Sequence, residues 1–266
     1  MKTNYHTHSV FSDGKNTLEE ICLEAVEKNF SVLGFSDHSF TDFDLCYCMK
    51  KENLGQYINQ INLLKQKYAD KLEIALGIEF DAFSKDIRRE DFDYIIGSAH
   101  YVEKDGVYYS VDHSHEISNH NIKVGFGGNT DEYAKEYYKT LCYHIEKNTP
   151  DIVGHLDVVA LYGNVDETTK TYKNSALETA KLAVEKGCVI ELNTAAVFKK
   201  LKNIPYPSEF ILDYIKEIGG KVTIDADAHV KQNLDFWFDE TKELLKQKGF
   251  KTVSYFTNGH FEEYKI

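Results

Sequence analysis

Proline is scarce in this chain of 266 residues, and so are the stretches that usually join two domains. The three prolines are Pro150, Pro205 and Pro207, and no Gly/Ser-rich or low-complexity tract accompanies them. A linker between domains would be expected in such a tract. The length suits one large α/β barrel, and we therefore expect a single domain over residues 1–266.

An excess of positive charge is also missing. Lys and Arg number 31 against 43 Asp and Glu, which gives a formal net charge of -12. Nucleic acids and anionic membranes select for a positive surface, so we expect neither as a partner. A phosphorylated small molecule is still compatible with this charge if bound metal cations supply the positive charge inside the protein.

Long apolar runs are absent as well. No stretch approaches the ~18 residues that cross a bilayer, and residues 1–6 lack the apolar run of a signal peptide. The five cysteines are odd in number and scattered, unlike a disulfide framework. We therefore expect a cytoplasmic protein, and the sequence gives no indication of its oligomeric state.

The chain has instead a regular alternation of short apolar runs with longer amphipathic runs. The apolar runs predict seven strands, at residues 3–8, 31–36, 72–79, 94–98, 152–155, 189–193 and 221–226. The amphipathic runs predict helices at residues 17–29, 54–69, 131–147, 172–186, 208–218 and 236–249. Such strands pair in parallel through right-handed crossovers, in a closed barrel or in an open doubly wound sheet.

The polar residues at the strand ends favour the barrel. In a barrel, functional groups gather at the carboxyl end of every strand, whereas in an open sheet they gather at one switch point. Nearly every predicted strand here ends in a candidate metal ligand. In chain order these ligands are His6, His8, Asp13, His38, Glu79, His100, His155, Asp227 and His229. We therefore predict a TIM-like α/β barrel with its active site at the carboxyl ends of the strands.

The number of these side chains predicts more than one metal ion. His6 and His8 are two residues apart, which places alternate side chains of a strand on the same face. Six imidazoles and three carboxylates exceed the donors that one Zn, Mn or Fe ion takes. We infer two or three such ions, bridged by Glu79. A second His-x-His pair, His113 and His115, lies in a polar loop without a strand pattern, and we do not expect it to bind metal.

The series of strand-end motifs resembles the PHP superfamily, named for polymerase and histidinol phosphatase. The motifs are His6-x-His8, Ser12-Asp13-Gly14, Ser36-Asp37-His38, Glu79, Gly97-Ser98-x-His100, Gly154-His155-x-Asp157 and Asp227-x-His229. Residues 93–102 and 190–194 are similar to its histidinol-phosphate phosphatase branch. The resemblance covers most of the chain and implies a distorted (β/α)7 barrel with three metal ions.

The resemblance also implies a ligand set for each ion and a reaction. His6, His8, Glu79 and Asp227 would hold one ion, Glu79, His100 and His155 a second, and Asp13, His38 and His229 the third. A hydroxide that bridges two ions would hydrolyse L-histidinol phosphate to L-histidinol and inorganic phosphate, a step of histidine biosynthesis. The leaving alkoxide needs a proton or a metal contact, for which we expect Asp157 or a metal-bound water.

Further residues are candidates for binding the substrate. Its amino group and imidazole require acidic or aromatic partners, and Asp42, Asp112 and Glu116 follow strands in loops. For the phosphate, the phosphatase branch usually carries a basic residue where this chain has Ala160, and another near Val197. The only arginines are the adjacent Arg88 and Arg89, and the lysines nearest to Val197 are Lys199, Lys200 and Lys202. Our candidate is Lys199; otherwise the ions bind the phosphate almost alone, or Ala160 marks a weakened site.

Three other functions are compatible with parts of this pattern. A phosphoesterase on the same scaffold could act on another small phosphate monoester or a nucleotide. A metal-dependent amidohydrolase also begins with His-x-His, but it usually carries a metal-bridging Lys after a middle strand, and no strand end here offers one. A catalytically inactive metal-binding variant would fit the loss of a basic residue at Ala160.

Overall fold

The computed structural model describes residues 1–85 and 87–266. Within these ranges, seven strands form one parallel sheet in the order β1-β2-β3-β4-β7-β8-β9. Their bounds are β1 Thr3–Asn4, β2 Val32–Phe35, β3 Glu73–Asp81, β4 Tyr94–Ser98, β7 Ile152–Val153, β8 Val189–Asn193 and β9 Val222–Asp225. A parallel bridge between Thr7 and Ala228 joins the two edges of the sheet. The chain is therefore a distorted (β/α)7 barrel, which confirms the predicted fold.

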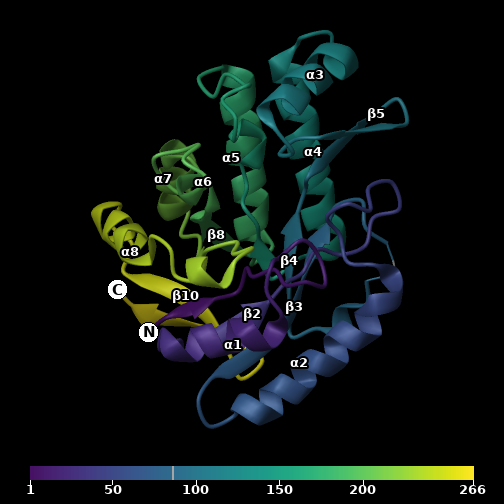
Figure 1. Cartoon of the computed structure of the whole chain (residues 1–266). Coiled ribbons are helices and arrows are strands. Elements are labelled where there is room, and N and C mark those ends of the chain that lie inside the picture. The colour runs from purple at the N-terminus through teal and green to yellow at the C-terminus, as the bar shows by residue number, and fades with distance from the viewer. Residues whose placement is uncertain (86) are drawn as a thin grey trace.

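Long helices surround the sheet (Figure 1). They are α1 Leu18–Glu27, α2 Leu54–Tyr68, α4 Thr130–Asn148, α5 Lys170–Glu185, α7 Glu209–Glu217 and α8 Phe238–Gln247. Each lies within two residues of the helix that the hydrophobic periodicity predicts. At α1 the start is fixed by a capping box, in which Thr17 and Glu20 each bond the other's backbone N–H. No helix of the described chain is long and apolar enough to cross a membrane.

Two strands end earlier than the sequence predicts. β1 pairs with β2 at Thr3 and Asn4 alone, and β7 ends at Val153, although we expected them to reach residues 8 and 155. His155 has a φ of 44°, in the left-handed region that non-glycine residues rarely adopt and that breaks a strand. The histidines of both segments therefore lie just beyond the ladder, where the backbone turns at the mouth of the barrel.

Several short elements were not predicted from the sequence. They are the hairpin of β5 Tyr101–Lys104 and β6 Val107–Ser110, the helices α3 His115–Phe126 and α6 Ala195–Phe198, and the hairpin of β10 Thr252–Thr257 and β11 His260–Lys265. The β5–β6 turn is Asp105-Gly106, with a φ of 55° and 79°, a dipeptide that favours tight hairpins. The Ser114 hydroxyl accepts the Ile117 N–H and begins α3, so the prediction of a polar loop at His113 and His115 is wrong from residue 115 onward.

The C-terminal hairpin covers the amino end of the barrel, beside the two chain termini (Figure 1). The Tyr5 hydroxyl donates to the Phe256 carbonyl (3.1 Å) and accepts the Phe256 N–H (2.8 Å). Behind it, the buried Tyr94 hydroxyl donates to the carbonyls of Tyr5 (2.5 Å) and Phe35 (3.1 Å). These aromatic side chains fill the amino end of the barrel.

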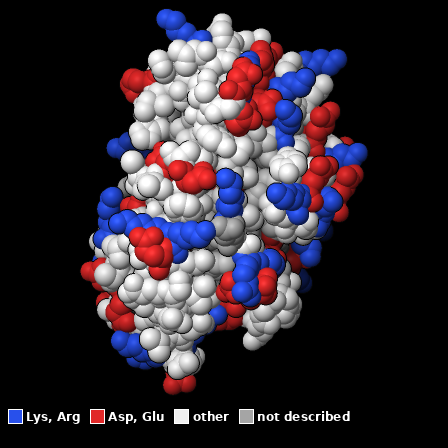
Figure 2. Space-filling view, turned by 90° about the vertical axis from the view of Figure 1, so that its right-hand side faces the viewer, with Lys and Arg blue, Asp and Glu red and all other residues white. Residues whose placement is uncertain are grey.

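Charges of both signs share the surface. On the face shown in Figure 2, Lys and Arg side chains are interspersed with Asp and Glu, and no broad field of positive charge is visible on that face. Many are paired, such as Lys65 with Asp93 at 2.5 Å. Pairs near the surface contribute little to stability.

Replacing Gly77 by Ala tests the packing at the amino end of the barrel. A Cβ at Gly77 would lie 2.3 Å from Cζ of Tyr94, so the substitution forces a buried ring to move. We expect a loss of about 1–3 kcal/mol in the free energy of unfolding, measured with urea.

Gly55 supplies the matched control for this experiment. It lies in α2, and a Cβ there would meet nothing within 4 Å. Gly55→Ala should be neutral or slightly stabilising. Equal urea midpoints for the two variants would contradict the proposed packing.

Candidate metal centre

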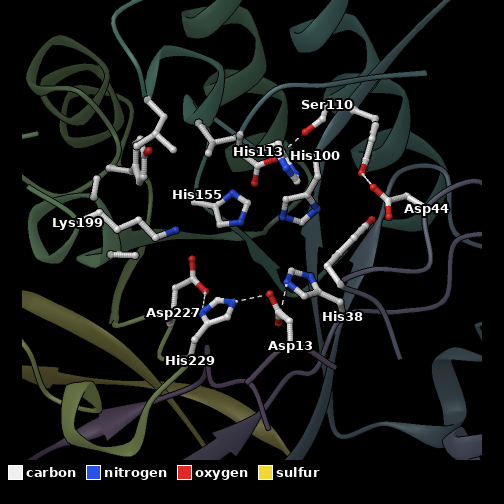
Figure 3. A pocket seen from close by; sticks show the side chains of 18 of the residues that line it. Asp13, His38, Asp44, His100, Ser110, His113, His155, Lys199, Asp227 and His229 are labelled. Carbon is white, nitrogen blue, oxygen red and sulfur yellow. Dashed lines mark hydrogen bonds and ion pairs between the residues drawn. The ribbon is translucent and has the colours of Figure 1, made fainter. Parts of the chain in front are cut away.

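A cavity of about 310 Å³ opens at the carboxyl ends of the barrel strands. Figure 3 shows imidazoles and carboxylates that point into it from segments far apart in the sequence. The predicted ligands that line it are Asp13, His38, His100, His155, Asp227 and His229. The other three, His6, His8 and Glu79, are almost fully inaccessible to solvent in the barrel interior. The structure thus brings all nine predicted side chains together.

Glu79, near the end of β3, lies at the centre of the cluster. Five imidazole nitrogens lie close to its two oxygens: those of His6 at 3.3 Å, His8 at 3.7 Å and His38 at 2.7 Å from Oε2, and those of His100 at 3.2 Å and His155 at 2.9 Å from Oε1. Each oxygen therefore faces a different group of imidazoles. This is the arrangement that a carboxylate bridging two cations requires.

The donor atoms fall into groups of the size that a metal ion takes. Four overlapping groups have donor atoms within 4.8 Å of one another: His8, Asp13, His38 and His229; His6, His155 and Asp227; His6, His8 and Glu79; and His38, Glu79 and His100. The Asp227 Oδ1 atom lies 3.1 Å from His8 Nε2 and 3.7 Å from His6 Nε2. Tetrahedral zinc with ligands at about 2.0–2.1 Å has donor–donor edges of about 3.4 Å. The spacing therefore fits divalent ions without rearrangement of the chain.

Unpaired polar atoms support the same fit. Among the described residues, several buried donor atoms of the cluster have no hydrogen-bond partner: His6 Nε2, His8 Nδ1 and Nε2, Asp13 Oδ1 and His155 Nδ1. Buried polar atoms without a partner are costly and rare in proteins. Coordination to a cation would satisfy the nitrogens and oxygens that face the centre of the cluster.

The electrostatics favour the metal-binding form at Glu79 and His8. Burial raises the pKa of the Glu79 carboxyl, but the imidazoles of His38, His6 and His100 outweigh it and hold that pKa well below its usual value. Burial, together with the neighbouring His229 and His38, lowers the pKa of His8 to about 3. A carboxylate and a neutral imidazole are the protonation states that bind metal. At His6, His100 and His229 burial lowers the pKa, but nearby carboxylates outweigh it and raise that pKa above its usual value.

The loop that carries Asp13 is held by a buried aspartate, Asp37. Its carboxylate accepts hydrogen bonds from the N–H and hydroxyl groups of Ser9 and Ser12, at 2.6 to 3.0 Å. The loop folds back so closely that a Cβ at Gly14 would lie 2.3 Å from the His8 carbonyl oxygen. Gly14 therefore allows the contact that brings Asp13 beside the histidines.

Sequence reasoning missed the side chains that hold the predicted ligands. Asp81 accepts a hydrogen bond from Nδ1 of His100 at 3.1 Å, and Glu191 contacts Nδ1 of His6 at 2.6 Å. Both are fully buried in strands, and Asp81 is two residues from Glu79. A charged residue inside an apolar strand was the signal that could have found both, and Asp81 is also in phase with Glu79 on the same strand.

The predicted substrate residues separate into two groups. Asp112 and Lys199 line the cavity, and the Lys199 side chain points between His155 and Asp227 (Figure 3). Asp42 is 56% exposed and pairs with Lys85 at 3.0 Å, and Glu116 is exposed in the first turn of α3. Both lie outside the cavity lining.

Asp44 lines the cavity although sequence reasoning did not select it. Its carboxylate accepts a hydrogen bond from the Tyr101 hydroxyl at 2.5 Å. His113 also lines the cavity, but it belongs to none of the candidate metal-binding groups of the described residues, so the expectation that it binds no metal stays a prediction.

Asp157 does not face the cavity. Its carboxylate is fully buried and accepts hydrogen bonds from the Ser208 N–H at 2.9 Å and the Ser208 hydroxyl at 2.5 Å. The 3-10 turn Val158–Ala160 follows it directly and continues the turn away from His155. The geometry therefore assigns Asp157 to holding the segment around Ser208, and it does not support proton transfer to a leaving group.

No arginine of the described chain reaches the cavity. Arg89 pairs with Asp151, at 2.7 Å, before the amino end of β7, and Arg88 pairs with Glu90 at 3.1 Å. These residues lie at the opposite end of the barrel from the cluster. Among the described residues that line the cavity, Lys199 is the sole lysine or arginine.

The sequence comparison agrees with this geometry. A family model described as PHP domain matches residues 4–195, which include seven of the nine clustered side chains, all except Asp227 and His229. The chain belongs to the PHP domain family. The histidinol-phosphatase of Lactococcus lactis is 27% identical over 278 residues, which cover 99% of this chain and 97% of that protein.

Solved structures show the same fold. A Listeria monocytogenes protein has a TM-score of 0.78 and 22% identity, over 90% of this chain and 99% of that one. The histidinol phosphate phosphatase of Lactococcus lactis, in complex with zinc, L-histidinol and phosphate, has a TM-score of 0.73 and 23% identity, over 98% of both chains. This PHP domain therefore has relatives with the same barrel along nearly its whole length.

Adding metal to the metal-free protein should raise its thermal stability. An ion that binds the folded cluster and not the unfolded chain contributes about 3 kcal/mol at one hundred times its Kd. For a chain of this size, that corresponds to a rise in Tm of about 5–10 °C. Differential scanning calorimetry with Zn or Mn measures it. His8→Asn should reduce the rise, and an unchanged Tm in the wild-type protein would contradict the metal centre.

Proposed function

We propose that this protein is a metal-dependent phosphoric monoester hydrolase that converts L-histidinol phosphate into L-histidinol and inorganic phosphate, in histidine biosynthesis. The observation that carries the proposal is the convergence of six imidazoles and three carboxylates on one cavity around the shared Glu79. Membership of the PHP domain family and the similarity to a histidinol-phosphatase over nearly the whole chain support the choice of reaction.

Three ions would use all nine donor residues of the cluster. His6, His8, Glu79 and Asp227 would hold one ion, Glu79, His100 and His155 a second, and Asp13, His38 and His229 a third. Zinc, manganese and iron each accept this mixture of imidazole and carboxylate. When bound, such ions neutralise phosphoryl oxygens and lower the pKa of coordinated water.

Both positive and negative side chains line the cavity: Lys199 on one hand, and Asp112 and Asp44 on the other. Lys199 would donate to a phosphoryl oxygen, because it is the lysine that points toward the cluster. Asp112 and Asp44 would accept hydrogen bonds from the amino group and imidazole of the substrate. Asp157 would take no part in proton transfer, because it is bonded to Ser208 outside the cavity.

One observation favours a second candidate, a phosphatase of another small phosphate monoester. Ala160 is buried in a 3-10 turn, and no arginine lines the cavity among the described residues. Phosphate recognition would therefore depend on the ions and Lys199. A phosphate ester with a different leaving group could be bound by the same groups. Comparing kcat/KM for histidinol phosphate with that for nucleoside monophosphates and other small phosphate esters separates the two candidates.

Replacing His155 by Ala tests the metal-dependent reaction. The change removes a nitrogen that lies 2.9 Å from Glu79, and we expect phosphate release with Mn or Zn to fall at least about 100-fold, because several kcal/mol of charge stabilisation is lost. Bound metal, measured by mass spectrometry, should fall in parallel. His120, exposed on α3, supplies the control, and His120→Ala should keep both values. Undiminished turnover in His155→Ala would refute the proposal.

Replacing Lys199 by Gln tests the phosphate contact. A hydrogen bond from a charged donor contributes about 1.5–3 kcal/mol, so kcat/KM should fall by about 10–100-fold while the metal content stays unchanged. Lys200→Gln, at the neighbouring lysine outside the cavity lining, should leave kcat/KM near the wild-type value. If both variants behave alike, Lys199 does not bind the phosphate.

A further inference from the structure

Strand β8 supplies none of the nine clustered donors, yet it places a carboxylate directly beneath them. Glu191 of β8 is fully buried. A buried carboxylate requires hydrogen bonds or a cation to offset its lost hydration. The partners of Glu191 therefore show what this residue does.

Both oxygens of Glu191 have a partner, and one of these partners is a clustered histidine. Oε1 lies 2.6 Å from Nδ1 of His6, and Oε2 accepts a hydrogen bond from the Asn193 side-chain amide at 3.1 Å. The same amide lies 3.3 Å from Oδ2 of Asp227. Through two side chains, β8 thus contacts two of the donor residues.

The contact with Glu191 determines which nitrogen of His6 is free. A proton on Nδ1, donated to Glu191, leaves Nε2 with its lone pair. That Nε2 is buried, has no hydrogen-bond partner, and lies 3.3 Å from Glu79 Oε2 and 3.7 Å from Asp227 Oδ1. A neutral His6 ring that donates from Nδ1 to Glu191 therefore presents a metal-binding nitrogen to the other donors.

Backbone pairing alone holds the neighbourhood of His6 weakly. His6 follows β1, Asp227 follows β9, and the two edges meet through the Thr7–Ala228 bridge. The backbone bonds there are the His8 N–H to the Ala228 carbonyl, at 3.0 Å, and the Ala228 N–H to the His6 carbonyl, at 3.1 Å. Neither bond sets the rotation of the His6 ring, so a side-chain contact is needed to fix it.

We infer that Glu191 is a positioning residue that holds the His6 ring with Nε2 toward His8, Glu79 and Asp227, and so sets the affinity of this donor group for its divalent ion. Carboxylates that bond the second nitrogen of a ligand histidine orient the ring and raise its basicity. The inference rests on the metal centre of the proposed function, and it does not depend on the substrate.

Zinc binding by Glu191→Gln tests this inference. Competition with chelators of graded affinity measures how tightly each bound zinc ion is held, without any substrate. We expect one ion to be held about 10–100-fold more weakly and the others to change little, and Glu191→Ala to lose at least as much as Glu191→Gln. The visible spectrum of the cobalt-loaded protein should also change, because it reports the geometry of the coordinated ligands.

Two further variants separate positioning from general damage to the barrel. Asp157→Asn alters an equally buried carboxylate, which accepts the Ser208 N–H and has no hydrogen bond to a histidine, and zinc affinity should stay within about twofold of the wild type. In a His6→Ala background, Glu191→Gln should weaken zinc binding no further, because Glu191 acts through His6.

Three results would overturn the inference: unchanged affinity in Glu191→Gln, an equal loss in Asp157→Asn, or the same loss in the His6→Ala background. A wild-type protein that binds no zinc would instead refute the proposed metal centre. A protein that binds zinc normally but releases no phosphate would refute the proposed reaction and leave the role of Glu191 intact.

Discussion

Full burial of the Glu79 carboxylate is the constraint from which the site follows. An isolated ion in a protein interior costs several kcal/mol, so its oxygens must meet positive charge or hydrogen-bond donors. Five imidazole nitrogens within 3.7 Å meet this need only in part, because imidazolium ions so close together would repel one another. Burial, together with the neighbouring His229 and His38, lowers the pKa of His8 to about 3, whereas at His6 and His100 burial is outweighed by nearby carboxylates, which raise the pKa. Divalent cations resolve the conflict, since they bind the carboxylate and the neutral imidazoles together.

The distortion of the barrel is the structural consequence of this cluster. β1 and β7 are only two residues long, and each ladder ends before the histidine that follows it. His155 and Asp227 adopt positive φ angles of 44° and 49°, which non-glycine residues rarely do. Strain of this kind persists where the surrounding structure fixes the conformation, as at functional sites. The mouth of the barrel therefore lacks ladder hydrogen bonds at the places where the metal-ligand side chains converge. The contacts of Tyr5, Tyr94 and Phe256 stabilise the opposite end.

Hydrophobic periodicity was sufficient to predict the strands of the barrel and the long helices around it. The seven strands and six long helices follow from the spacing of apolar residues, and the nine donors follow from the rule that the carboxyl ends of parallel strands meet. Loop conformation is different, because a few local hydrogen bonds determine it. The Asp44 carbonyl and carboxylate bond the Thr41 hydroxyl and the Cys46 N–H, and this turn places Asp44 in the cavity while Asp42 faces Lys85. Composition does not distinguish two acidic residues so close in one loop.

Adjacency in sequence was also a poor guide to function next to the cluster. Asp157 is two residues from His155, yet the turn between them directs its carboxylate to Ser208. Glu191 lies far from His6 in the chain and contacts its ring. The difference arises because strand ends turn sharply, whereas a lumen-facing residue inside a strand is held toward the neighbouring strands.

The charged side chains that line the cavity indicate how the protein would discriminate among phosphorylated ligands, although few lysine or arginine side chains lie near its site. For the proposed substrate, the ions and Lys199 would face the phosphate, while Asp44 and Asp112 would face the amino and imidazole groups. A substrate with negative charge along its whole length would place some of it against these carboxylates. Specificity of this kind comes from repulsion of the wrong ligand as much as from attraction of the right one. An additional arginine in the cavity would strengthen phosphate binding, but it would also attract those competing polyanions.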